Sequence, residues 1–170
     1  AAFGFCNMLL KLIEDIQIEK GGRVSIAVIF DAARETFRNL IYPEYKANRS
    51  DAPDDLIPQF EYIRKSVEAF NIPAVEMINY EADDLIATYS KQITKLGSDV
   101  TIVSSDKDLM QLHDKKVRIY DPMKNKFIKK EDVIAKFGVT SDKVIDVQSL
   151  AGDSSDNVPG VPGIGVKTAA

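Results

Sequence analysis

The sequence predicts an α/β fold built on a doubly wound, mostly parallel sheet. Short runs of β-branched, apolar residues alternate along the chain with segments whose apolar residues recur at helical spacing. Strands that alternate with helices are typical of parallel sheets with right-handed crossovers. Several of the apolar runs end directly in acidic residues. Because ligands of such sheets gather at the carboxyl ends of the strands, these acids mark the expected site.

The first half of the chain contains two predicted helices and one predicted strand. Residues 3–16 carry apolar side chains at helical spacing, and Lys20–Gly22 is expected to end this helix. The run VSIAVIF, residues 24–30, predicts a strand that is buried on both faces. Residues 34–55 are polar, irregular and rich in charge, which favours a mobile loop or a marginal helix. The next apolar periodicity predicts a helix over residues 56–70.

The second half continues the alternation of strands and helices. A short strand is expected at residues 74–78, and the helix that follows should end at Gly97. The run DVTIVSS, residues 99–105, predicts another strand. Residues 116–138 then predict a strand, a turn at Asp121–Asn125, a further short strand and a helix that ends at Gly138.

The amino-acid composition and the charge distribution limit the classes of protein to which the chain can belong. The 170-residue chain is 45% apolar and 28% charged, which is sufficient for a buried core. It has no apolar run long enough to span a bilayer and no signal peptide, so we expect a cytoplasmic protein without a membrane partner. The single cysteine, Cys6, excludes a disulfide framework and a thiolate metal site. The net charge is −4, yet Lys115–Lys130 is rich in lysine and arginine and nearly free of acids. Acidic and basic residues are therefore segregated along the chain, as expected for a site that holds cations beside phosphates.

Acidic residues follow three of the predicted strands. These strands lead, in order, to Asp31, to Glu81 with Asp83 and Asp84, and to Asp106 with Asp108. Acids favour the first turn of a helix, but this effect accounts for one or two carboxylates and leaves the third in YEADD unexplained. Carboxylates that lie this close repel one another unless a cation sits among them. Oxygen-only ligands favour hard ions, so the sequence predicts bound Mg²⁺ or Mn²⁺.

The C-terminal stretch GDSSDNVPGVPGIGVKTA combines an acid pair with a glycine-rich turn. Asp153 and Asp156 are spaced i, i+3, so they would share a face in a helical turn and add two carboxylates to the cluster. Gly163 and Gly165 permit close approach of the backbone. Such a turn, with Lys167 in the first turn of a following helix, offers N–H groups and an ammonium to a phosphate; a plain Pro/Gly turn is the alternative.

Five segments occur in a specific order and spacing: VIFDA, TFRNLIYPEYKANR, YEADDLIA, SSDKDLMQL and the C-terminal stretch. Together they resemble the 5′→3′ exonuclease domain of bacterial DNA polymerase I, part of the flap endonuclease family, over essentially the whole chain. The resemblance implies a PIN-like (Rossmann-like) three-layer α/β domain with a mostly parallel sheet over residues 1–138. It also implies the start of a helix-hairpin-helix-type DNA-binding domain over residues 139–170.

The resemblance also implies roles for individual residues. The family's metal-binding carboxylates fall on Asp31, Glu81, Asp83, Asp84, Asp106, Asp108, Asp153 and Asp156, which would hold two Mg²⁺ or Mn²⁺ ions. Its DNA-contacting residues fall on Arg38, Tyr45, Lys46 and Arg49, and the hairpin residues Gly163, Gly165 and Lys167 would grip duplex DNA, with a K⁺ ion bound at the hairpin. Lys46 and Arg49 would also be catalytic, because they would neutralise charge on the scissile phosphate.

The implied activity is hydrolysis of DNA phosphodiester bonds at 5′ ends and flaps during replication and repair. The setting would be the bacterial cytoplasm in association with the nucleoid, with a polymerase domain as a partner in the full-length protein. Relative to the family pattern the chain is expected to be truncated at both ends, since it opens on the helix after the family's first strand and stops within the hairpin.

Three other functions fit parts of the pattern. A non-catalytic DNA-binding fragment would share the basic residues, and release of short products from a 5′ flap would exclude it. A PIN-type ribonuclease would share the sheet and the acids but lacks the PGVPGIGVKTA and YKANR segments, and it would prefer single-stranded RNA. A receiver-like phospho-acceptor domain needs far fewer acids and no basic segment.

Overall fold

The computed structural model describes residues 1–20 and 24–170, with side chains described for 1–15 and 24–170. The expected helix stop at Gly21 and Gly22 lies outside the described residues. The order of elements is α1 (Ala2–Lys20), β1 (Val28–Ile29), α2 (Phe37–Ile41), α3 (Ile57–Ala69), β2 (Ala74–Val75), α4 (Ala82–Lys95), β3 (Val100–Val103), η1 (Asp108–Leu112), β4 (Val117–Asp121), β5 (Lys126–Ile128), α5 (Lys130–Phe137), η2 (Ser141–Lys143), α6 (Val144–Ala151) and α7 (Val166–Ala169).

The strands form two sheets rather than the single sheet that we expected. β1 pairs with β2 in parallel, in the register Val28↔Ala74. β3 pairs with β4 in parallel, and β4 pairs with β5 antiparallel. The described backbone of β1 makes no ladder with β3, so the mostly parallel sheet is divided in two. The strand expected over residues 24–30 is correspondingly short, and its two paired residues are half-buried rather than buried on both faces.

The second sheet carries most of the apolar core. Its buried members come from β3, β4, β5, η1, α5 and the start of α6: Ile102, Leu109, Val117, Ile119, Ile128, Val133, Phe137 and Val144. Alternate residues of β4 point into this core, as the pleat of a half-buried strand requires. On the side of β1 and β2, α1 and α3 contribute one buried apolar side chain each among the side chains that are described, Leu9 and Val67.

Two helices end at the glycines that the sequence predicts, whereas α6 was not predicted. Gly97 follows α4 with φ of +92°, and Gly138 caps α5 with φ of +77°, a left-handed conformation that glycine adopts without strain. Thr36 is the N-cap of α2. Its hydroxyl accepts the Arg38 N–H, and the side-chain oxygen of Asn39 accepts the Thr36 N–H at 2.9 Å. No helix among the described residues is long and apolar enough to cross a membrane.

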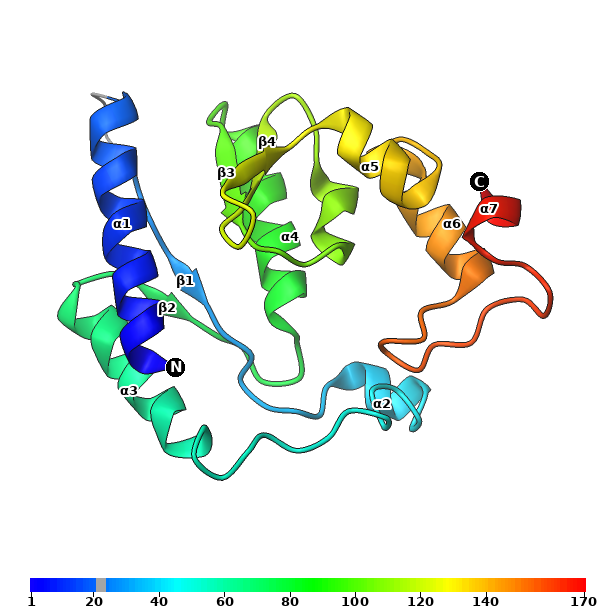
Figure 1. Cartoon of the computed structure of the whole chain (residues 1–170), viewed down its shortest axis with the longest axis horizontal. Helices are drawn as coiled ribbons and strands as arrows, with labels where there is room; N and C mark the ends of the chain where they lie inside the picture. The colour runs from blue at the N-terminus through cyan, green and yellow to red at the C-terminus, as the bar shows by residue number, and fades with distance from the viewer. Residues whose placement is uncertain (21–23) are drawn as a thin grey trace.

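Figure 1 shows how this arrangement creates a site. α1 and α3 lie beside β1 and β2, whereas α4 lies against the second sheet. The loop after α2 approaches the turn that follows α6, although about a hundred residues separate the two segments; the Lys46 N–H donates to the Asp156 carbonyl at 2.9 Å. The start of α4 is near both, because Lys46 faces Glu81 as well as Asp156, so segments far apart in sequence meet there.

Candidate metal and nucleic-acid site

The N-terminus of α4 is the centre of the site. Glu81 is its N-cap and is only 8% exposed, while Asp83 and Asp84 occupy the first turn. Asp84 accepts the Glu81 N–H at 2.9 Å, which satisfies a free donor of the helix. Arg38 of α2 donates two hydrogen bonds of 2.7 Å to the two oxygens of Asp84. Because of this fork the pKa of Asp84 lies below its ordinary value.

Asp83 is in a different environment from its neighbour. Among the described side chains it has no cationic partner in an ion pair. Burial, together with the nearby negative charges of Asp106 and Glu81, raises the pKa of Asp83 to about 6. This shift reports that carboxylates from α4 and from the loop after β3 lie close together, as the sequence predicted for the ends of neighbouring strands.

The loop after α2 inserts its polar side chains between two of the acids. We define residues 42–50 as the basic loop. The Tyr45 hydroxyl donates to Glu81 at 3.1 Å and lies 3.3 Å from an oxygen of Asp156. The Lys46 ammonium lies 2.9 Å from Glu81 and 3.9 Å from Asp156, and Arg49 pairs with Asp156. Burial and these two carboxylates together raise the pKa of Tyr45, so its hydroxyl stays protonated.

Asp31 and Asp106 flank this centre on exposed loops. Asp31 follows β1, and its carboxylate accepts the N–H of Ala82 in the first turn of α4 at 2.7 Å. Asp106 follows β3 and accepts the Asp108 N–H at 2.9 Å. Asp31 thus contacts the α4 N-terminus directly, whereas this contact of Asp106 lies within its own loop.

Two residues that the sequence did not single out hold the remaining acids. Gln148 of α6 donates to Asp108 at 2.6 Å, and Lys107 pairs with Asp153 while lying 3.6 Å from Asp108. Burial by itself would raise the pKa of Asp153, but hydrogen bonds from Lys107 and Ser155 outweigh it and lower this pKa to about 2. Lys107 lies between two acids in SSDKD, which is the signal that could have drawn attention to it.

The acid pair near the C-terminus does not form a helical turn. An antiparallel bridge between Asp153 and Val158 closes a tight turn, and this turn directs the two acids to different partners. Asp156 contacts the basic loop, whereas Asp153 contacts Lys107. The i, i+3 spacing therefore brings both acids to the site without placing them on one helix face.

The hairpin residues lie apart from the acid cluster. Gly163, with φ of +80°, Gly165 and Lys167 are all exposed, and α7 packs against α6. A side chain added at either glycine would meet open space, so close approach of a ligand is sterically free there. No described contact joins these three residues to the carboxylates.

A pocket of about 240 Å³ lies where these elements meet. Its lining includes Arg38, Tyr45, Glu81, Asp83, Asp84, Asp108, Gln148 and Asp156. The donors are oxygen atoms of several carboxylates, which suits a hard divalent cation. As the side chains stand, no three acids among the described residues converge closely enough to hold an ion. The physical reason is that most of them are turned toward a cationic partner, namely Arg38, Lys46, Arg49 or Lys107.

Comparison with protein families agrees with this architecture. A family model described as 5′-3′ exonuclease, N-terminal resolvase-like domain, matches residues 1–138. A second, described as 5′-3′ exonuclease, C-terminal SAM fold, matches residues 139–170.

Individual relatives give the same result. The chain is 56% identical to a DNA polymerase I of Rhizobium leguminosarum, and the match covers 100% of this chain and 17% of the relative. It is 42% identical to a 5′-3′ exonuclease of Aquifex aeolicus, covering 99% of this chain and 57% of the relative. The chain thus spans under a fifth of one relative and little over half of the other.

Solved structures of a bacteriophage T5 nuclease share the fold. The T5 5′-exonuclease with bound zinc superimposes with a TM-score of 0.81 at 27% identity, covering 97% of this chain and 65% of that chain. The T5 flap endonuclease in a pseudo-enzyme-product complex with DNA and metal ions gives 0.80 at 27% identity, covering 97% and 64%. The described fold is therefore the expected α/β, PIN-like one, and the chain belongs to the 5′-3′ exonuclease family.

Proposed function

We propose that this chain carries the catalytic region of a metal-dependent 5′→3′ exonuclease and flap endonuclease that hydrolyses DNA phosphodiester bonds at 5′ ends and flaps. The observation that supports this most is the meeting of carboxylates from separate segments with the basic loop at one pocket. The T5 neighbours are structures with bound zinc and with DNA and metal ions, which suits the same use here. DNA and, in the full-length protein, a polymerase domain are the proposed partners.

The residues fit a pair of hard cations, Mg²⁺ or Mn²⁺. Asp31, Glu81, Asp83 and Asp106 are the proposed ligands of one ion, and Asp108, Asp153 and Asp156 those of the other, with Asp84 in either set or behind them. Such a pair would supply activation of water and stabilisation of the leaving oxygen. The negative charges of Asp106, Glu81 and Asp108 contribute to the raised pKa of Asp83, which supports a shared cation site but does not divide the acids between the two ions.

The basic loop would act on the substrate itself. Lys46 and Arg49 are cationic and lie beside the pocket, so they would neutralise charge that develops on the scissile phosphate. Tyr45 presents an aromatic face on which a base can stack. Arg38 would contribute a further phosphate contact, although its guanidinium is at present engaged by Asp84.

The C-terminal segment would hold duplex DNA. Exposed N–H groups around Gly163 and Gly165, together with Lys167, would bind backbone phosphates, with a K⁺ ion at the hairpin. We divide the chain accordingly into a catalytic domain, residues 1–138, and the start of a DNA-binding domain, residues 139–170. The matched family ranges support this division.

Replacement of one carboxylate tests the proposal. Asp106→Ala in the full-length protein should abolish Mn²⁺-dependent release of short products from a 5′-flap DNA, while duplex affinity stays within about twofold, because the acid serves chemistry rather than grip. Asp99→Ala is the matched control, since Asp99 is exposed at the opposite end of the same strand. Near-normal cleavage by Asp106→Ala would refute the metal assignment, and preferential cleavage of single-stranded RNA would favour the ribonuclease.

A further inference from the structure

The basic loop is docked onto the acids that we propose as metal ligands. Tyr45 and Lys46 take one oxygen each of Glu81, and Arg49 and Lys46 face the two oxygens of Asp156. The backbone contributes as well, because the Lys46 N–H donates to the Asp156 carbonyl at 2.9 Å. Both oxygens of Glu81 are therefore engaged by a single segment of the chain.

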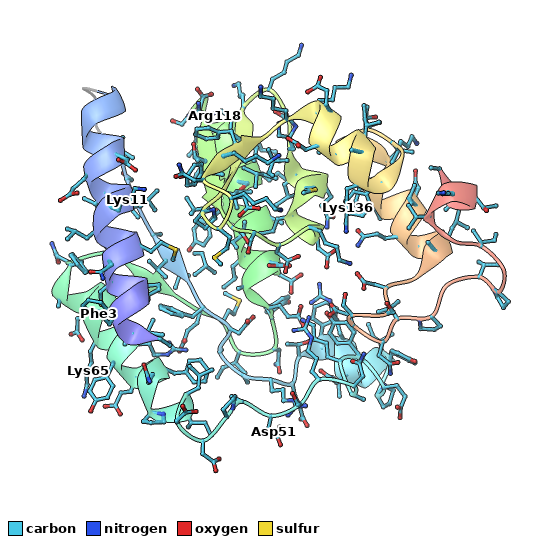
Figure 2. All side chains as sticks on the ribbon, viewed as in Figure 1. Phe3, Lys11, Asp51, Lys65, Arg118 and Lys136 are labelled. Carbon is cyan, nitrogen blue, oxygen red and sulfur yellow. The ribbon has the colours of Figure 1, made fainter. Side chains whose placement is uncertain are left out.

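Further contacts hold the loop against the turn that carries Asp156. The Asn48 amide donates to the Ser154 carbonyl at 2.9 Å, and the Asn157 amide donates to the Glu44 carbonyl at 2.7 Å. Figure 2 shows a dense group of side chains where the segment around α2 faces this turn. The docked loop is thus a specific arrangement of several bonds rather than a single ion pair.

The contacts of Lys46, Glu81 and Asp156 are shielded from water, whereas the Arg49 side chain is 52% exposed. The side chains of Lys46, Glu81 and Asp156 are 21%, 11% and 14% exposed. The ion pair between Arg34 and Asp51 belongs to the same chain segment, but its side chains are 59% and 86% exposed, and Asp51 lies on the outer rim in Figure 2. Shielded pairs are weakened less by solvent and salt than exposed ones, so the docked contacts have the larger energetic effect.

Docking also requires an unfavourable backbone conformation. Lys46 has φ of +56°, in the left-handed region that residues other than glycine rarely adopt. Such a residue stores backbone strain and persists only where surrounding contacts enforce it. The bonds to Glu81 and Asp156 supply that enforcement, so release of the loop would relieve the strain.

A divalent cation and the basic loop need the same carboxylate oxygens. An ion of this kind binds oxygens at about 2.0–2.6 Å and is repelled by an ammonium or guanidinium that already faces them. We propose that divalent ions and the side chains of Lys46 and Arg49 compete for Glu81 and Asp156, so that ion binding releases the basic loop toward the substrate phosphates. This inference rests on the proposed metal-dependent function and adds a coupling between its two parts.

Such a coupling must be reciprocal. If ion binding favours release of the loop, then loss of the docked side chains must tighten ion binding by the same free energy. The double variant Lys46→Met/Arg49→Met removes the competing cations and keeps most of the side-chain volume. Lys65→Met removes one positive charge from an exposed ion pair within α3, away from the basic loop, and so controls for a general effect of charge.

Calorimetric titration with Mg²⁺, without DNA, measures the effect directly on the full chain. We expect the double variant to bind Mg²⁺ roughly tenfold more tightly than the unaltered chain, whereas Lys65→Met changes the affinity by less than about twofold. Equal or weaker binding by the double variant, with Mg²⁺ binding retained in the unaltered chain, would overturn the competition but leave the metal site standing. Absence of Mg²⁺ binding in every variant would overturn the proposed function together with the coupling.

A second readout follows the loop itself. The chain contains no tryptophan, so Tyr42→Trp places a single fluorophore in the basic loop. Its emission should shift when Mg²⁺ is added to the otherwise unaltered chain and should not shift in the Lys46→Met/Arg49→Met background, where the loop is already released. An equal shift in both backgrounds, or no shift in the unaltered background despite Mg²⁺ binding, would contradict the coupling.

Discussion

The N-termini of α4 and α5 use the same local device in different surroundings. At α4, Asp84 accepts the Glu81 N–H at 2.9 Å; at α5, Asp132 accepts the Lys129 N–H at 2.8 Å. Each of these acids also has a cationic partner, Arg38 in the first case and Lys126 in the second. Both helices carry a second acid in the first turn, so a sequence pattern alone describes them alike.

The surroundings separate the two helices. Carboxylates from other segments face the α4 N-terminus, and burial together with Asp106 and Glu81 raises the pKa of Asp83 to about 6. At α5 the pKa of Asp132 is lowered, mainly by the hydrogen bond from Lys126. Helix capping therefore explains Asp84 and Asp132 equally well, but it does not explain Asp83. The acid without a local use marks the candidate site.

The largest expected difference between the two helices is in catalysis. Asp83→Asn should reduce flap cleavage about 10³-fold or more, because a proposed metal ligand contributes several kcal/mol of transition-state stabilisation. Glu131→Gln alters the corresponding first turn of α5 and should leave the rate unchanged. Single-turnover cleavage of a 5′-flap substrate measures both. Similar rates for the two variants would show that the α4 acids serve only the helix.

A smaller difference is expected in stability when the cationic partner of the capping acid is removed. Arg38→Met breaks a two-bond, partly shielded pair with Asp84 and should lower the free energy of unfolding by about 2 kcal/mol. Lys126→Met removes a more exposed, single-bond pair with Asp132 and should lower it by less than about 1 kcal/mol. Urea denaturation without divalent ions compares them, and a larger loss for Lys126→Met would reverse the proposed ranking.

The smallest expected effect concerns the pH dependence of stability, to which Asp83 and Asp132 should contribute with opposite signs. The folded pKa of Asp83, about 6, exceeds its ordinary value of 3.8, so its contribution to stability falls as pH rises between these values. Asp83→Asn should therefore stabilise the chain at pH 7 relative to pH 4. The pKa of Asp132 is lowered, so its contribution is present at pH 7 and is lost as pH falls through that folded pKa, and Asp132→Asn should destabilise at pH 7. Thermal unfolding at several pH values measures both, and equal signs at pH 7 would be inconsistent with these shifts.

Local rules account for much of the fold. The helix over residues 56–70, the stops at Gly97 and Gly138 and the turn before β5 follow from periodicity and from the conformational freedom of glycine. The division of the sheet was not predicted, because pairing between strands depends on distant segments and not on the apolar run at residues 24–30.

The proposed acids near α4 were predictable because they follow predicted strands, although β1 and β3 belong to separate sheets. Their partners were not. The contacts of Lys107 with Asp153, of Gln148 with Asp108 and of Arg49 with Asp156 join residues that lie dozens of positions apart. Such contacts depend on how α6 and the turn after it approach the sheet, and no local spacing encodes that approach.

Direct measurement of metal binding tests the central claim, which is that acids from separate segments form one cation site. Calorimetric titration with Mn²⁺ would compare the unaltered chain with Asp83→Asn/Asp106→Asn and with the matched pair Glu131→Gln/Asp132→Asn. We predict that the unaltered chain and the α5 variant bind Mn²⁺ with the same affinity. The Asp83→Asn/Asp106→Asn variant should lose about tenfold or more in affinity, because two proposed metal ligands are removed. Equal affinity in all three proteins, or no binding in any, would contradict the claim.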